Sequence, residues 1–135
     1  MSGSVFDQYA RQQNAEHDDG RQPYVAFELG VQGRRERRLM LFFQDGQISI
    51  LSYAYLMEVL CTSQQYISLI YTNCVITLRG KGLTAFLGML QDEKIRSLQC
   101  YHPEVHQPPA EDVPIILSMK RESPQVVLKR TSEKT

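Results

Sequence analysis

The densest group of charged side chains in the sequence is the run Arg34-Arg35-Glu36-Arg37-Arg38. Arginine binds phosphate through paired hydrogen bonds, so this run, together with Arg79 and Lys81, is a candidate site for an anion or a nucleic-acid backbone. Only alternate side chains of an extended segment share a face, which makes Arg35 and Arg37 a pair that can converge. The alternative is a solvated hairpin tip, the commoner role of a charge run.

The second candidate is a metal site in the segment 100–106, which contains Cys100, His102 and His106. Thiolate and imidazole are zinc ligands, but a structural zinc site usually has four. The fourth ligand would come from Cys61, from His17 or from a carboxylate elsewhere. The alternative is that these side chains coordinate nothing, as is usual for scattered Cys and His in a loop that contains proline.

Catalytic motifs are missing from the sequence. Residues 79–84, Arg-Gly-Lys-Gly-Leu-Thr, precede a predicted helix whose first backbone amides would attract anions. They lack the spacing of a nucleotide-binding loop, in which Lys is followed directly by Ser or Thr, and a strand-to-helix connection explains both glycines. No nucleophile elbow is present. We therefore predict no enzymatic activity and no cofactor.

The elements that position these residues are organised around the stretch 65–98. Alternation of apolar residues predicts two strands joined by a Thr72-Asn73 turn. Ile67, Leu69 and Tyr71 share one face of the first strand, and Cys74, Ile76 and Leu78 share one face of the second. Cys74 is therefore predicted to be a small buried hydrophobic residue.

After Arg79 the apolar period changes to that of a helix. Leu83, Phe86, Leu87 and Leu90 follow the spacing i, i+3, i+4 and i+7, which predicts a helix over Leu83–Gln91 that packs on a sheet. Gly82 is the expected N-cap and Gly80 the reversal out of the strand. Gly88, inside the helix, is expected to lie close to a strand.

Further strands are predicted on both sides of this unit. Leu39–Phe43 is apolar throughout, which indicates a strand buried on both faces or at a dimer contact. Residues 54–63 fit either a helical turn or an irregular edge. The other predicted strands are Tyr24–Val31 with Val25, Phe27, Leu29 and Val31 facing the core, Ile48–Tyr53 after an Asp45-Gly46 turn, Lys94–Tyr101, and Val113–Met119.

Length and composition indicate one domain. The 135 residues carry 15 basic and 15 acidic side chains, so no net field attracts nucleic acid or membranes. No apolar run is long enough for a membrane span or a signal peptide, which predicts a soluble cytoplasmic protein. We expect a flexible segment over residues 1–21, a domain over 22–119 and a charged tail over 120–135.

The predicted fold class is α+β: a curved antiparallel sheet of five to seven strands, forming a partial barrel, with one main helix packed on it. The favoured function is a non-enzymatic interaction module that forms homo-oligomers or binds a protein partner, because Leu39–Phe43 and the tyrosines at 53, 55, 66 and 71 supply apolar surface. The alternative is a small β-barrel protein that binds single-stranded nucleic acid through the arginines and stacking tyrosines.

Overall fold

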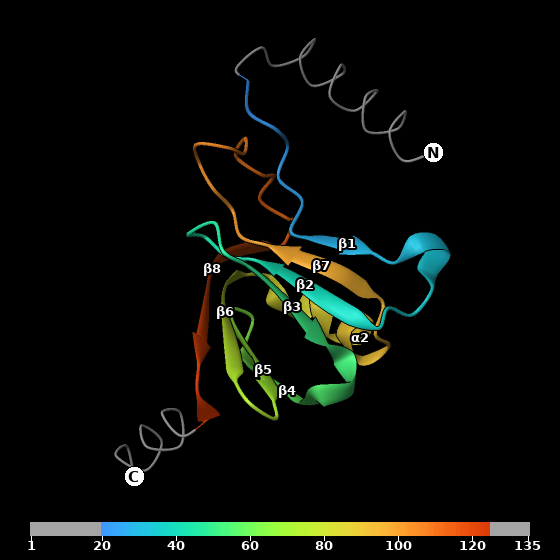
Figure 1. The fold of residues 1–135 in the computed structure, drawn as a ribbon. Coiled ribbons are helices and arrows are strands. Elements are labelled where there is room, and N and C mark those ends of the chain that lie inside the picture. Colours follow the sequence, from blue (N-terminus) through green and yellow to red (C-terminus); the bar gives the residue numbers. More distant parts are fainter. Residues whose placement is uncertain (1–19, 125–135) are drawn as a thin grey trace.

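The computed structural model describes residues 20–124, which form mainly strands with one short α-helix (Figure 1). The eight strands are β1 (Phe27–Leu29), β2 (Arg38–Phe42), β3 (Ile48–Ser52), β4 (Leu56–Ser63), β5 (Tyr66–Tyr71), β6 (Val75–Lys81), β7 (Ile95–Gln99) and β8 (Ile115–Glu122). The helical elements are the 3-10 turns η1 (Val31–Gly33), η2 (Tyr53–Tyr55) and η3 (Leu83–Phe86), and the α-helix α2 (Leu87–Gln91).

The strands form two four-stranded sheets, in the orders β1-β7-β2-β3 and β4-β5-β6-β8. The predicted α+β class therefore holds, but the single sheet of five to seven strands was wrong. Two features divide the sheet. The turn η2 carries the chain from β3 into the second sheet, and β7 returns to the first sheet, where it lies between β1 and β2 and pairs in parallel with β2.

The hairpin of β5 and β6 follows the predicted pattern. The two strands pair antiparallel around a two-residue turn, in which the Tyr71 amide donates to the Cys74 carbonyl at 2.9 Å. The faces that the alternation predicted as apolar are the buried ones, and Cys74 is buried with them. Burial of this face positions the hairpin against the other sheet.

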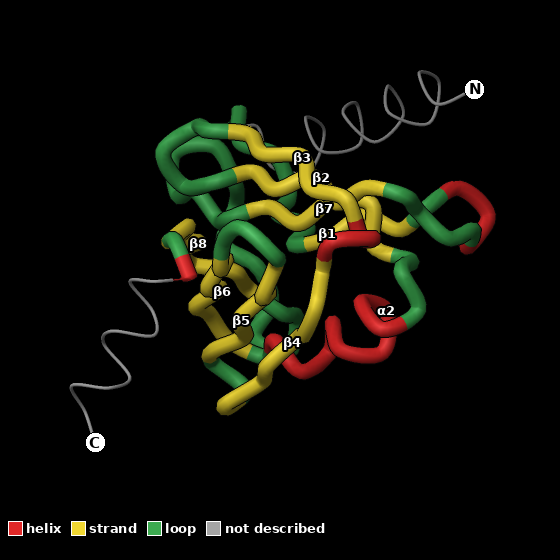
Figure 2. Tube along the Cα trace, turned by 60° about the horizontal axis from the view of Figure 1, so that its bottom comes forward, coloured by secondary structure: helices red, strands yellow, loops and turns green. Residues whose placement is uncertain are grey.

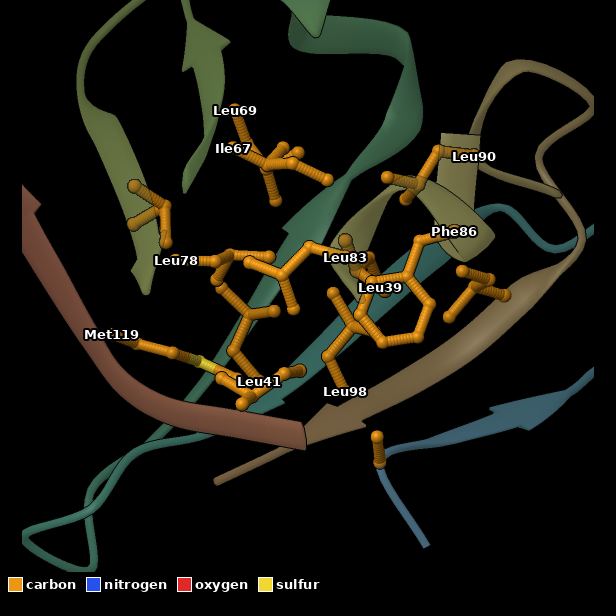
Figure 3. Packing of buried hydrophobic residues seen from close by; sticks show 14 of the residues in the cluster. Leu39, Leu41, Ile67, Leu69, Leu78, Leu83, Phe86, Leu90, Leu98 and Met119 are labelled. Atoms are coloured by element: carbon orange, nitrogen blue, oxygen red, sulfur yellow. The ribbon is translucent and has the colours of Figure 1, made fainter. Parts of the chain in front are cut away.

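The predicted helix is present as a 3-10 turn followed by one and a half turns of α-helix, η3 and α2. Leu83, Phe86 and Leu90 point into the core between the sheets (Figure 3). Gly82 precedes the first turn with a φ of +65°, a left-handed conformation that glycine adopts at little cost. The helix therefore packs where its apolar stripe predicted.

Two glycines have different roles from those predicted. Gly80 lies within β6, where a Cβ would overlap the backbone oxygen of Ile115 in β8. It therefore permits the close approach of two strands, and it does not reverse the chain. At Gly88 no atom beyond the adjacent residues and the helix's own backbone lies within 4 Å of where a Cβ would stand, so this glycine faces open space.

The first predicted strand was wrong in extent and in its buried face. Only Phe27–Leu29 pair as a strand, while Tyr24 and Ala26 are buried and Val25, Leu29 and Val31 are exposed. The Tyr24 hydroxyl explains part of this orientation, because it donates to the Gln99 carbonyl at 2.6 Å and accepts from the Ile116 amide at 3.0 Å.

The strand predicted to be buried on both faces is buried on one. In β2 and the residue after it, Leu39, Leu41 and Phe43 are buried, whereas Met40 and Phe42 are half-buried on the opposite face. There they pair across the sheet with Ile50 and Ile48 of β3, which are exposed. This outer face of β2 and β3 is therefore an apolar surface.

The two open sides of this pair of sheets are closed by different kinds of contact. At the side of β3 and β8, the Arg121 guanidinium donates to Ser49 Oγ at 3.2 Å, and the Met119 amide donates to Gln44 Oε1 at 2.9 Å. On the side of β1 and β4, η3 and α2 fill the gap, with the rings of Phe27 and Phe86 in edge-to-face contact at 5.4 Å. Polar bonds therefore join the first side and a helix occupies the second.

Three predictions concern the ends of the chain and membranes. Almost all of the predicted flexible segment 1–21 and most of the predicted tail 120–135 lie outside the described residues. Strand β8 nevertheless extends to Glu122, past the predicted start of the tail. Among residues 20–124, no helix has the length and apolar character needed to cross a membrane.

Candidate functional site

A concave surface lies between the edge strand β4 and the helix α2, which are neighbours in Figure 2. We call it the β4 groove, and its volume is about 410 Å³. Its lining residues are Tyr53, Leu56, Met57, Glu58, Val59, Leu87, Leu90, Gln91 and Glu93. Its lining combines five apolar side chains with one tyrosine, one glutamine and two carboxylates, and binding clefts likewise combine apolar surface with a few polar groups.

The sequence builds this groove because β4 is the last strand of its sheet. Val59 pairs with the buried Leu69 of β5 and lies on the core face. In the described chain, no strand pairs with the other edge of β4. Leu87 and Leu90 approach the same face from the helix. The groove is thus the part of the hydrophobic core that the edge of the sheet leaves open.

The free edge of β4 has some, but not all, of the features that prevent pairing with another strand. Natural edge strands are protected by lysine, proline, bulges or short length. β4 is eight residues long, contains neither lysine nor proline, and has two register shifts against β5. By contrast, β8 at the opposite edge carries Lys120, Arg121 and Glu122.

Exposed apolar side chains accompany this edge. Met57, at the first register shift, is 69% exposed and lines the groove, and Leu60 is 43% exposed. Single exposed apolar residues need no explanation, but a group of them beside an apolar groove marks an interaction surface. Backbone hydrogen-bonding groups and apolar surface are therefore available together along β4.

The charge at the groove is negative. Glu58 is exposed on β4 and Glu93 is half-buried after α2, and none of the described lining residues is basic. Arg35 and Arg37 line an adjoining cavity of about 400 Å³, together with Glu36, and the two cavities share Tyr53 and Glu93. The groove itself therefore favours an apolar ligand with a positive charge.

Tyr53 has a structural role at the junction of these cavities. Its hydroxyl donates to the Ile95 carbonyl at 2.6 Å. Burial raises its pKa, and the neighbouring Tyr71, Glu93 and Glu36 add to that rise. The phenol therefore remains neutral and holds η2 against β7.

The predicted basic residues do not converge on one site. The amide of Tyr53, just before β4, donates to the Arg37 carbonyl, whereas the amide of Gly80 donates to the Gln65 carbonyl just beyond the other end of β4. An eight-residue strand is roughly 26 Å long. Arg35 and Arg37 therefore lie near one end of β4, and Arg79 and Lys81 lie near the other.

The residues of the predicted metal site are engaged in other contacts. The Cys100 thiol is buried and lies 3.6 Å from Gln44 Oε1, and burial is the main cause that raises its pKa to about 12. His106 Nδ1 accepts from the His102 amide at 3.0 Å. In residues 20–124 no group of three or more Cys, His, Asp or Glu side chains is placed to share a metal ion.

His106 is a buried structural residue. Its Nε2 lies 3.1 Å from the side-chain nitrogen of Gln99, while its Nδ1 accepts from the His102 amide. Its ring packs against Tyr24 and Tyr101. Burial, assisted by the neighbouring His102, lowers its pKa. These contacts attach the loop before β8 to the end of β7.

Sequence reasoning did not identify the β4 groove. Residues 54–63 gave two competing periodicities because a register shift at Met57 interrupts the alternation of β4. Of the four tyrosines expected to supply surface, only Tyr55 and Tyr66 are exposed, whereas Tyr53 and Tyr71 are buried. The groove arises where two segments far apart in sequence meet, which no local pattern predicts.

Comparison with known proteins does not assign the chain to a group. No protein-family model, no curated protein and no solved structure matches it. What the protein does must therefore be inferred from its own residues, of which those at the β4 groove are the best arranged for binding.

Proposed function

We propose that this protein is a non-enzymatic interaction module that self-associates, and that the free edge of β4 with its groove is the contact surface. The observation that carries the proposal is an eight-residue edge strand without lysine or proline beside a groove of about 410 Å³. An added strand satisfies the free backbone groups of such an edge and places every second side chain in the groove.

The chemistry of the groove favours binding over catalysis. Its described lining consists of aliphatic side chains, one tyrosine, one glutamine and two carboxylates. The tyrosine hydroxyl is already bonded to the Ile95 carbonyl, and burial raises its pKa. The remaining groups are suited to contact and orientation of a ligand, since a nucleophile with an adjacent base is not among them.

Two apolar surfaces compete for the role of contact surface. The outer face of β2 and β3 presents Ile48 and Ile50, and β3 is also an edge strand, but Arg121 of β8 reaches that edge and donates to Ser49 Oγ. β4 adds unpaired backbone groups to its apolar surface, so contact there can form hydrogen bonds as well. We therefore assign self-association to β4.

Sedimentation equilibrium of the full chain between about 1 and 500 μM tests the proposal, a range that spans weak and intermediate affinities. We expect a reversible rise in mass with concentration. Met57→Lys places a charge on the groove and should weaken association, whereas Ile50→Lys on the outer face of β3 is the matched control and should not. A monomer over the whole range would refute self-association, and sensitivity to Ile50→Lys alone would refute the assignment to β4.

A further inference from the structure

The sequence after β8 contains a segment whose chemistry matches the β4 groove. Residues Val126, Val127 and Leu128 are followed by Lys129 and Arg130. Valine favours strands, and the two cations complement Glu58 and Glu93, the two acidic residues that line the groove. Building on the proposed function, we propose that residues 126–130 of a second copy of this chain pair with β4 as an added strand.

The position of β8 requires a second copy. Glu122, the last residue of β8, pairs with Val75 at the edge opposite β4. A strand added outside β4 would lie four strand spacings from β8, roughly 19 Å. The four residues from Glu122 to Val126 span at most about 14 Å. The segment therefore cannot place Val126 beside β4 of its own chain, but it can reach a neighbouring molecule.

An antiparallel orientation matches the charges. In a strand, Val126, Leu128 and Arg130 would share one face and Lys129 would lie on the other. With Leu128 beside Val59, Arg130 lies toward the start of β4, the end at which Glu93 and Tyr53 line the groove. Lys129 then shares the outer face of the sheet with Glu58, which pairs with Ile70 away from the core.

The free edge explains why such pairing can be specific. The apolar side chains of the segment fill the unoccupied width of the groove, which Leu56 and Val59 border on one side and Leu87 and Leu90 on the other. Register is fixed by alternation, because a shift of one residue would place Lys129 in the apolar groove. Exchange of the segment in both directions closes a dimer with two equivalent contacts.

A charge-exchange experiment in the full chain tests this pairing. The variants are Glu58→Lys, Lys129→Glu and the double variant, measured by sedimentation equilibrium at low salt with circular dichroism as the control for folding. We expect each single variant to raise the dissociation constant about tenfold, because an attraction becomes a repulsion at both contacts of the dimer. The double variant should recover most of the loss.

Leu128→Asp is the stronger variant, since it places a carboxylate in the apolar groove, and we expect it to raise the dissociation constant at least a hundredfold. Circular dichroism is again the control for folding, so that a loss of association can be told from a loss of structure. The control is Thr131→Asp, which lies beyond the pairing segment and should change the constant less than threefold.

The outcomes separate this inference from the proposed function. If the full chain self-associates and Leu128→Asp has no effect, another part of the second copy occupies β4, and the inference is wrong while the proposed function stands. If the double variant self-associates no more tightly than the single variant with the lower affinity, Glu58 and Lys129 do not meet. A chain that remains monomeric at all concentrations would refute both.

Discussion

Two glycine-to-alanine substitutions should change stability in opposite directions. At Gly80 a Cβ would overlap the backbone oxygen of Ile115, and a backbone atom cannot rotate away as a side chain can. Strand β8 would have to move away from β6. Overpacking costs about 1 to 3 kcal/mol and each weakened backbone hydrogen bond about 1 kcal/mol, so Gly80→Ala should destabilise the protein by roughly 2 to 4 kcal/mol.

Gly88→Ala is the matched control. This glycine lies in α2 with open space where the Cβ would stand. Alanine is favoured over glycine inside a helix by about 1 kcal/mol, so the variant should be as stable as the parent or more stable by up to that amount. The same added methyl group therefore distinguishes a close strand contact from an exposed helical position.

Urea unfolding followed by circular dichroism provides the measurement. With a slope of about 2 kcal/mol per M, typical of a small protein, Gly80→Ala should lower the midpoint by about 1 to 2 M and Gly88→Ala should raise it slightly. Equal midpoints for the two variants would refute the close pairing of β6 with β8. That pairing also places the residues after Glu122 at the edge opposite β4, so the result bears on the proposed exchange.

Two further predictions concern buried polar side chains. The Tyr71 hydroxyl is buried and has no hydrogen-bond partner among the described residues, so Tyr71→Phe should leave the free energy of unfolding unchanged or raise it by about 1 kcal/mol. Tyr53→Phe loses the bond to the Ile95 carbonyl and should lower the free energy of unfolding by about 1 to 2 kcal/mol; equal effects in denaturant unfolding would contradict this difference. Burial lowers the pKa of His106, so the unfolded chain binds a proton at this side chain more readily than the folded chain does. The stability that the neutral His106 contributes is complete above about pH 6.5 and is lost as the pH falls through the folded pKa. Unfolding between pH 5 and 8 should show this loss in the parent and a reduced loss in His106→Gln; identical pH profiles would exclude the role of His106.

Local patterns in the sequence predicted the elements that are stabilised by their own neighbours. The β5–β6 hairpin has strict alternation over a short turn, and the stripe of Leu83, Phe86 and Leu90 is buried as its spacing requires. In both cases the residues that form the element also determine its buried face, so periodicity was sufficient.

Contacts between distant segments could not be predicted in the same way. β7 pairs in parallel with β2, from which it is separated by more than 50 residues, and no period in the sequence encodes that partner. The face of the first strand was wrong because β1 has only three residues and the hydroxyl of Tyr24 bonds to two other strands. A short strand contributes little to its own orientation, and tertiary contacts decide it.

The candidate site was missed for a related physical reason. Attention to charged and metal-binding residue types favoured Arg35, Arg79 and Cys100, which occupy separate places in the fold. Within residues 20–124 no strand lies on the outer side of β4, and the groove depends on this property of the topology. Only the irregular pattern at Met57 gave a local sign of it.

Amide hydrogen exchange in β4 tests the central claim most directly. In an edge strand alternate amides point away from the sheet and exchange readily. We predict that the outward-pointing amides among residues 56–63 exchange at least tenfold more slowly well above the dissociation constant than well below it, while amides of β3 do not change. Unchanged exchange in β4 under conditions where the mass has doubled would show that the protein associates through another surface.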